Sequence, residues 1–328
     1  MTTLLRPGDL DAATALLRGC GVFAGGETAQ SAEPAGEGNM NVTLRVRSAV
    51  RSVIAKQSRP FVAKYPQIAA PPERVAAEAR FYRLAVESPA AARWLPKLLA
   101  YDRAAELLVL EDLGESADFL GSYRGGRAAE FRDVAESAAA IHAVPLGHAA
   151  DVECRPLREL NADHMFGLPF GEEPPVDLDA IVPGLAARTQ SVRHSTLVRD
   201  AAARLRCVYF TPVGGGVLLH GDFYPGSWLR TAGGLRVIDP EFAFAGPAEF
   251  DLGVAAGHAA LATGRFSTGE LFDAYGRASG REPDRELASR FAATEVLRRL
   301  LGVAQLPLRS GLEWRVGLAS EAADVLTG

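Results

Sequence analysis

The order in which strand-like and helix-like segments follow one another constrains this chain more than any other feature. The first third holds four apolar runs, two of them rich in β-branched residues, and such runs predict strands. They are Val42–Val46, Ser52–Lys56, Leu98–Tyr101 and Leu107–Leu110. Asp9 can cap a helix that continues to about Leu17. Pro71-Pro72-Glu73 opens a second helix, whose apolar positions are Val75, Ala79, Tyr82 and Val86.

The remainder of the chain has mostly helical patterns. Helices are predicted over Arg127–Ala143 and Leu197–Tyr209 and again from Glu249 to the end, whereas Pro156–Pro183 is predicted to be irregular. A small strand pair, Val217–Leu219 and Leu235–Ile238, interrupts the helices. Strands that come first and helices that come second are typical of an α+β fold, not of an alternating α/β sheet.

Length and composition agree with two lobes of a soluble protein. A chain of 328 residues, 48% hydrophobic and 23% charged, is large enough for two substantial units. We expect the seam at Gly114, which gives lobes over residues 1–113 and 114–328, with a ligand cleft between them. The formal net charge of −5 argues against nucleic acid or an anionic membrane as a partner.

Targeting and redox features point to the cytoplasm. No apolar run approaches the roughly 18 residues that span a bilayer, and the acidic N-terminal segment does not resemble a signal peptide. Three widely spaced cysteines, Cys20, Cys154 and Cys207, argue against a disulfide framework or a zinc site and favour a reducing compartment. We therefore expect a cytoplasmic enzyme or binding protein.

The densest group of chemically active residues lies between His220 and Asp251. Asp222 and Asp239 each follow a predicted strand, on either side of a hairpin, so their carboxylates should reach the same rim. Mg²⁺ is held by hard oxygen ligands, which fits Asp239 and the nearby Glu241. Asp222 would then orient and deprotonate an attacking hydroxyl. A turn aspartate is the commoner role for either residue alone, but the cluster as a whole favours chemistry.

These residues resemble a known family. His220-Gly221-Asp222, followed by Gly226-Ser227 and then by Ile238-Asp239-Pro240-Glu241, is similar to the catalytic core of the aminoglycoside phosphotransferase and choline kinase superfamily. Four features narrow the resemblance to the methylthioribose kinases: Ser227 where most relatives have Asn, the string IDPEFAFAGPAEFDLG, the loop Gly36–Asn41 and the pair Arg298-Arg299. They span residues 36 to 302.

The resemblance implies a protein-kinase-like bilobal fold and Mg²⁺-dependent transfer of the γ-phosphate of ATP or GTP to a small-molecule hydroxyl. It makes Asp222 the catalytic base and turns Ser227, Asp239 and Glu241 toward the metal and the phosphates. Arg298 and Arg299 match a twin arginine that holds the substrate and the transferring phosphate.

For the nucleotide, the resemblance implies a second set of residues. Lys56 matches the lysine that contacts the α- and β-phosphates, and Glu78 matches its helix partner. Glu111 to Leu113 match the hinge whose backbone binds the purine. The loop with Gly38, Asn39 and Asn41 would lie over the phosphates and offer backbone N–H groups.

The residues themselves support these assignments. Only three of the 35 basic residues are lysines, and Lys56 follows an apolar strand, where an ammonium needs an anionic partner. Glu78 comes one position before Ala79, near the buried edge of its helix. Apolar neighbours on both sides of Arg298-Arg299 predict a buried helix, and guanidinium groups match phosphate oxygens.

Other residues of the cluster have supporting roles or depart from the family. We expect His220 to brace the catalytic loop by hydrogen bonding and Asp251 to brace it from behind. Phe223 and Tyr224 stand where these kinases usually carry Leu and His, a difference that would alter the acceptor pocket and leave the base in place.

Two acceptor classes remain open. One is a methylthioribose-like sugar in a salvage pathway, and the other is a sugar hydroxyl of an aminoglycoside or nucleoside antibiotic, whose phosphorylation would give resistance. The acidic stretch Glu172–Asp179 could border the cleft and suit a polycation. A nucleotide-binding protein without transferase activity is the alternative, supported only by the missing Asn at position 227. A helical binding module would explain neither Lys56 nor the Asp222/Asp239 pair. The resemblance is compatible with a homodimer.

Overall fold

A five-stranded antiparallel sheet forms the N-terminal part of the chain. The computed structural model describes residues 3–36, 41–62, 65–69, 71, 73–147, 152–211, 215–308 and 311–328. The strand order is β1-β2-β3-β7-β6. The bounds are β1 (Ser31–Pro34), β2 (Val42–Arg47), β3 (Ser52–Gln57), β6 (Leu98–Asp102) and β7 (Leu107–Glu111). All four predicted strands are confirmed, and β1 is an additional one.

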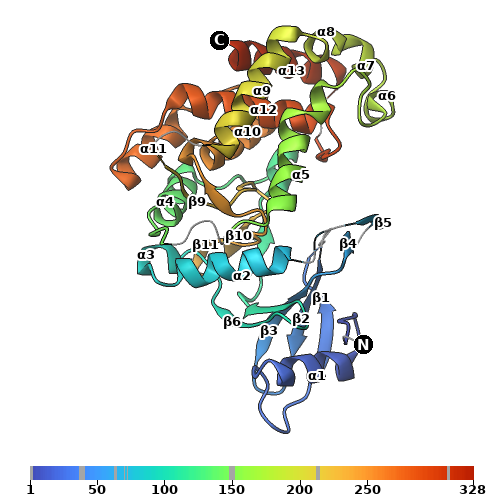
Figure 1. Cartoon of the computed structure of the whole chain (residues 1–328), viewed down its shortest axis with the longest axis vertical. Coiled ribbons are helices and arrows are strands. Elements are labelled where there is room, and N and C mark those ends of the chain that lie inside the picture. Colours follow the sequence, from blue (N-terminus) through green and yellow to red (C-terminus); the bar gives the residue numbers. More distant parts are fainter. Residues whose placement is uncertain are drawn as a thin grey trace.

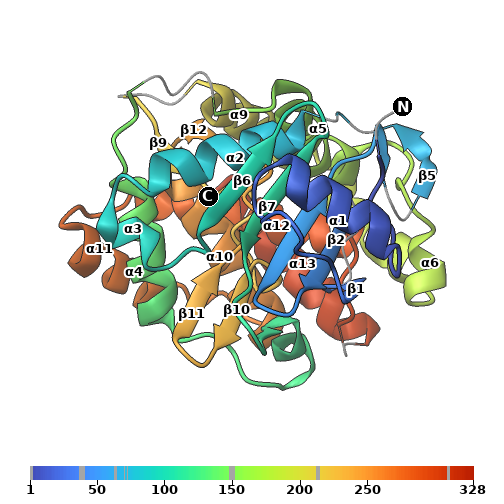
Figure 2. The same cartoon turned by 90° about the horizontal axis from the view of Figure 1, so that it is seen from below.

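Strand alternation decides which way Lys56 faces. Along β3, Val53 and Ala55 are buried in a cluster with α1 (Leu10–Gly19), whereas Ile54 packs into the cluster on the other side of the sheet. Because successive side chains point to opposite faces, Lys56 shares the face of Ile54, toward α2 (Arg74–Ala85). Figures 1 and 2 show α1 outside the sheet and α2 on the side of the helical part.

Helices dominate the rest of the chain, at the opposite end of the molecule in Figure 1. The longer helices are α4 (Phe131–His142), α5 (Arg155–Phe166), α9 (Thr196–Phe210), α10 (Ala248–Thr263), α11 (Gly269–Ser279), α12 (Arg285–Leu301) and α13 (Leu312–Thr327). Shorter helical segments are α3 (Pro89–Ala92), η1 (Leu120–Arg124), η3 (Leu168–Phe170), α6 (Leu178–Ile181), α7 (Leu185–Arg188) and α8 (Gln190–Arg193). The α+β class is confirmed. Among the described residues, the longest apolar helix is still too short to cross a membrane.

The remaining strands are short and correct one prediction. β9 (Val217–Leu219) pairs with β12 (Phe244–Gly246), and β10 (Trp228–Thr231) pairs with β11 (Gly234–Val237). The two predicted strands therefore exist but do not pair with each other, because each finds a partner that its sequence pattern did not reveal. β8 (Ala117–Asp118) adds to β10, and β4 (Phe61–Val62) pairs with β5 (Tyr65–Ala69).

Other boundaries also differ from the sequence prediction. The segment from Pro156, predicted to be irregular, begins with α5, because proline is tolerated in the first turn of a helix and lies there in α5. α4 begins at Phe131, four residues later than expected. Val86 follows the end of α2 and is 63% exposed, so it is no core position.

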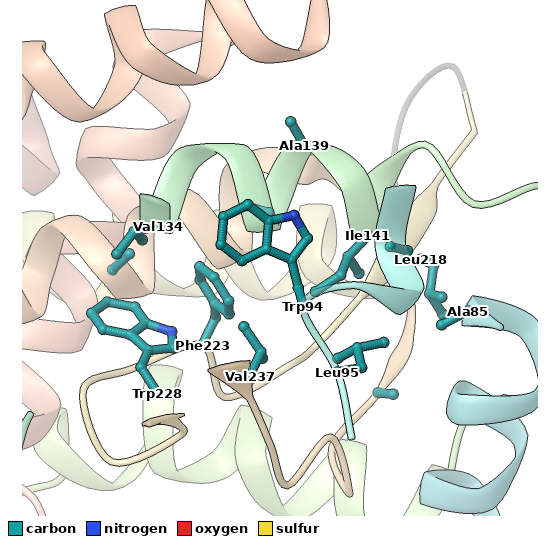
Figure 3. Close-up of a cluster of buried hydrophobic side chains, with 14 of the residues drawn as sticks. Ala85, Trp94, Leu95, Val134, Ala139, Ile141, Leu218, Phe223, Trp228 and Val237 are labelled. Carbon is teal, nitrogen blue, oxygen red and sulfur yellow. The ribbon is translucent and has the colours of Figure 1, made fainter. Parts of the chain in front are cut away.

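One hydrophobic cluster extends across the predicted seam at Gly114. Figure 3 shows Trp94 and Leu95, from the N-terminal part, close to Phe223, Trp228 and Val237 of the C-terminal part. The Val237 N–H also donates to the Trp94 carbonyl oxygen at 2.7 Å. The division into lobes at residue 113 stays a prediction. The hydrophobic core is continuous across this boundary.

Two glycines allow α10 and α12 to cross closely. A Cβ added at Gly253 would collide with Phe291 and lie 2.7 Å from the Ala288 carbonyl oxygen, and one at Gly257 would lie 2.8 Å from the Ala292 carbonyl oxygen. Both are far below ordinary van der Waals contact. This crossing fixes where α12 lies against α10 and therefore also fixes the position of Arg298-Arg299.

We predict that the same substitution has opposite effects at two helical glycines. Gly253→Ala should lower the free energy of unfolding by about 1–3 kcal/mol, because the added methyl overpacks the crossing. Gly317→Ala, on an exposed face of α13 with open space around it, should raise it by about 0.5–1 kcal/mol through helix propensity. Chemical denaturation measures both. Equal changes at the two sites would contradict the close crossing.

Candidate active site

Lys56 is a buried cation shared between two carboxylates. Its Nζ donates to Glu78 Oε2 at 2.5 Å and also to Asp239 Oδ1. Lys56 is 6% exposed and Glu78 1%. The contact expected between Lys56 and Glu78 is therefore present, and Asp239 joins it from a segment 183 residues further along the chain.

Ionisation within this group follows from burial and charge. Burial lowers the pKa of Lys56, but Asp239 and Glu78 outweigh it and hold that pKa well above its usual range. Desolvation beside Lys56 raises the pKa of Asp239, yet the Lys56 ammonium outweighs this effect and the pKa lies below its usual range. Lys56 is thus a fixed positive charge and Asp239 a fixed negative one at neutral pH.

Asp239 adopts a backbone conformation that is uncommon for a residue with a side chain. It follows β11 with a φ of 67°, one of two described non-glycine residues with positive φ. That left-handed region costs free energy for most L-residues. The conformation leaves the side chain 48% exposed while one oxygen still meets Lys56, so the carboxylate has room for a further ligand.

Glu241 is held by residues of the N-terminal part. Its Oε2 accepts from Asn41 Nδ2 at 2.8 Å and lies 3.8 Å from Arg74 Nε, which in turn donates to Asn41 Oδ1 at 2.8 Å. Asn41 is therefore placed beside Glu241, at the end of the predicted phosphate loop. Gly38 and Asn39 lie outside the described residues. Arg74, which sequence reasoning missed, is the first residue of α2 and is fully buried.

Asp239 and Glu241 fit a magnesium ion. Burial and the neighbouring Asp239 charge raise the pKa of Glu241, to about 7, because a second negative charge disfavours ionisation. A divalent cation would relieve this repulsion, and Mg²⁺ commonly takes one or two carboxylates together with substrate phosphates. Over the part of the chain that the structure describes, no three His, Cys, Asp or Glu side chains converge on a metal-sized site.

The loop that carries Asp222 is braced as expected. Asp251 accepts the N–H groups of His220 and Gly221 at 2.7 and 3.0 Å, and His220 Nε2 lies 2.8 Å from the Ile238 carbonyl oxygen. Gly221 has a φ of 84°, and an added Cβ would collide with the Phe242 carbonyl. The predicted bracing by His220 and Asp251 is confirmed. Only glycine fits at position 221, between His220 and Asp222.

Ser227 connects the two acidic segments. Its Oγ donates to the Asp222 carbonyl oxygen at 3.0 Å, and its own carbonyl accepts the Ile238 N–H at 2.9 Å. The loop bearing Asp222 thus lies against the residues that precede Asp239, as the sequence predicted. Ser227 is 3% exposed, and its assignment to the metal stays a prediction.

Arg298 and Arg299 reach Asp222 from α12. Arg298 Nη1 and Arg299 Nη2 lie 3.9 and 3.6 Å from Asp222 Oδ1. The Arg299 guanidinium also stacks on Tyr224, 5.2 Å from its ring centroid. Tyr224 therefore forms a wall of the site beside the arginine pair. The structure brings the predicted base and the predicted twin arginine together.

A further buried group, absent from the sequence prediction, supports the arginines. Glu295 Oε2 accepts from Arg298 at 3.0 Å and Oε1 accepts from Arg299 at 2.6 Å. His258 Nε2 lies 2.9 Å from Glu295 Oε1, and His258 Nδ1 lies 2.6 Å from Tyr123 Oη. The spacing of Glu295 to Arg298 and Arg299, three and four residues along a helix, is the signal that could have revealed it.

The predicted hinge and the predicted acidic stretch are each anchored by a hydrogen bond from an arginine. Glu111 ends β7, and Asp112 beside it accepts from Arg45 and Ser52, which anchors the segment up to Leu113. The acidic stretch begins where Arg193 Nη2 donates to the Glu172 carbonyl oxygen, and Leu178 within it is buried. Purine binding by 111–113 and contact of 172–179 with an acceptor both stay predictions.

The comparisons with known proteins agree with this geometry. The model of the phosphotransferase enzyme family (APH) matches residues 32–289, and the chain belongs to that family. Methylthioribose kinase from Exiguobacterium sibiricum is 27% identical over 237 residues, which cover 68% of this chain and 59% of the relative. The matched part therefore spans less than two thirds of this curated relative.

Solved structures confirm the fold. The structure of LicA in complex with AMP has a TM-score of 0.57 and 16% identity, covering 98% of this chain and 99% of the other. Spectinomycin phosphotransferase APH(9)-Ia, in complex with ADP and spectinomycin, also has a TM-score of 0.57, with 13% identity and 98% of both chains covered. The predicted kinase-like α+β architecture is thus correct.

We predict that Asp251→Asn destabilises the protein by about 1–3 kcal/mol, because the new amide cannot accept from both buried N–H groups and one of them loses its acceptor. Asp9→Asn is the matched control. Asp9 caps α1 by accepting from the Ala12 N–H, and Asn caps a helix as well as Asp. Denaturant titration compares the two variants. Equal stability of both would contradict the bracing role of Asp251.

Proposed function

We propose that this protein is a Mg²⁺-dependent small-molecule kinase that transfers the γ-phosphate of ATP or GTP to a sugar hydroxyl. One observation carries the proposal. Lys56 pairs with Glu78 and Asp239, while Asp222, in the loop that Ser227 braces, faces an arginine pair. A fixed cation, two metal-fitting carboxylates and a carboxylate base are the parts that phosphoryl transfer requires.

The chain's own residues divide the reaction between them. Lys56 would hold the α- and β-phosphates of the donor, and the backbone of Glu111 and Leu113 would hold its purine. Ser227, Asp239 and Glu241 would hold Mg²⁺. When bound, Mg²⁺ neutralises phosphate charge. Asp222 orients the acceptor hydroxyl and accepts its proton as the acceptor oxygen bonds to the γ-phosphorus. The bond from that phosphorus to the β-bridging oxygen breaks, and the nucleoside diphosphate leaves.

Arg298 and Arg299 favour one acceptor class over another. Two guanidinium groups within 4 Å of the base can donate hydrogen bonds to the hydroxyls of an uncharged sugar. The similarity to a methylthioribose kinase points the same way. We therefore favour an uncharged, methylthioribose-like sugar as acceptor. An antibiotic sugar hydroxyl is the competing outcome of the assay below.

The expected cellular setting is the cytoplasm. The three cysteines are free, which suits a reducing compartment, and a cytoplasmic enzyme has nucleoside triphosphates at hand. Tyr224 and Phe223 replace the side chains usual in the family, so the acceptor pocket has a shape of its own. Tyr224 stacks on Arg299, and Phe223 is buried against Trp228.

We predict turnover on methylthioribose, measured as nucleoside diphosphate release with Mg²⁺ and ATP or GTP, across a panel that also holds aminoglycosides and nucleoside antibiotics. Asp222→Asn should lower kcat by about 10²-fold or more, because it removes the general base, and should leave nucleotide affinity unchanged. Asp239→Ala should weaken nucleotide binding as well. Bound nucleotide without turnover on any acceptor would favour the alternative, a nucleotide-binding protein that transfers nothing.

A further inference from the structure

The most enclosed charged group of the helical part is the carboxylate of Glu295. Its side chain is fully buried, and both of its oxygens accept from the arginine pair. Burial raises the pKa of Glu295, but Arg298 and Arg299 outweigh it and hold the pKa well below its usual range. Burial lowers the pKa of His258, and its Nε2 lies 2.9 Å from Glu295 Oε1 at the rear of the group.

Asp222 Oδ1 faces the same arginines without bonding to them. The guanidinium nitrogens lie 3.6 and 3.9 Å away, beyond hydrogen-bond distance, and this oxygen is a buried acceptor with no hydrogen-bond partner. The nitrogens that bond at short range do so to Glu295, at 2.6 and 3.0 Å. Glu295 and Asp222 therefore compete for one pair of cations, and Glu295 prevails.

This competition has a consequence for a base. A carboxylate bound tightly by two guanidinium groups is stabilised as the anion and is a poor proton acceptor. Two arginines balanced by two carboxylates make a neutral set, in which Asp222 is attracted but not clamped. About a fifth of the Asp222 side chain is exposed while Oδ1 is buried, which leaves Oδ2 as the oxygen that an acceptor hydroxyl can meet.

We propose that Glu295 is a positioning residue, which draws the twin arginines back from Asp222 and so keeps the base free to take a proton. The proposal rests on the proposed function, because it assigns the base role to Asp222. His258, tied to Tyr123 and packed against Tyr224 at 5.2 Å between ring centroids, fixes the orientation of Glu295.

Another buried glutamate gives a matched control. Glu249 on α10 is 4% exposed, and its Oε1 accepts the Asp284 N–H at 3.1 Å. Among the described residues, no hydrogen bond or ion pair joins Glu249 to Arg298, Arg299 or Asp222. Glu249→Gln thus removes a buried carboxylate of the same kind without disturbing the arginine pair.

The kinetic experiment compares Glu295→Gln, Glu295→Asp and Glu249→Gln in the full-length protein. Glu295→Gln should lower kcat about 10- to 100-fold, the loss typical of displaced catalytic groups, with KM for the nucleotide changed less than about twofold. Glu295→Asp keeps the charge and should recover part of kcat. Glu249→Gln should leave both constants unchanged. A wild-type kcat in Glu295→Gln, or equal losses in the two Gln variants, would overturn the proposal.

A second experiment needs no turnover, so it separates this proposal from the proposed function. In a double-mutant cycle of unfolding, Asp222→Asn should raise the unfolding constant at least about tenfold more in the Glu295→Gln background than in the wild type. In that background, Asp222 is the remaining carboxylate within 4 Å of the arginines among the described ion pairs. If the effects of Asp222→Asn and Glu295→Gln on unfolding were additive, Glu295 and Asp222 would not share the charge of the arginine pair, and the proposal would be wrong.

A double-mutant cycle of Asp222→Asn with Glu249→Gln serves as the control. The effects of these two substitutions on the unfolding constant should be additive. If Glu295→Gln does not fold at the assay temperature, Glu295→Asp takes over the kinetic comparison against Glu249→Asp. The shorter carboxylate should then lower kcat in the first variant only, and equal losses in both would again overturn the proposal.

Discussion

The buried ammonium of Lys56 is the interaction on which the rest of the arrangement depends. A lysine at this depth is tolerable only when carboxylates compensate it, and here one comes from α2 and the other from the C-terminal part. The pairing uses the face of β3 that strand alternation gives Lys56, involves the positive-φ residue Asp239 and joins segments far apart in sequence. The core around Trp94 continues beneath it, so charge and packing fix the same junction.

A second charged group, made of Glu295, Arg298 and Arg299, lies beside Asp222. The close crossing of α10 and α12, made possible by Gly253 and Gly257, buries Glu295 and brings the arginine pair to the base. The loop is held between the two groups by Asp251, His220 and Ser227, each through backbone groups. One group suits the phosphates of a nucleotide, and the other suits an acceptor hydroxyl.

Much of the fold and the centre of the site could be predicted from the sequence, because the signals were local. Alternation placed β3, and the motif around Asp222 and Asp239 carried the family resemblance. The rest depended on distant partners. β9 and β11 paired with strands that have no pattern of their own, and Arg74 resembled any other helix arginine until Asn41 and Glu241 closed on it. The prolines between Pro156 and Pro183 favoured an irregular segment, although Pro156 itself lies in the first turn of α5, where proline is tolerated.

The most direct test of this account is the thermal stabilisation of the protein by a nucleoside triphosphate with Mg²⁺, compared between the wild type and Lys56→Met. If Lys56, Asp239 and Glu241 form a nucleotide site, ATP or GTP with Mg²⁺ should raise the Tm of the wild type, chelation of Mg²⁺ should reduce the rise, and Lys56→Met should abolish most of it. A wild type that gains no stability from either nucleotide, or a Lys56→Met variant that gains as much, would contradict the account.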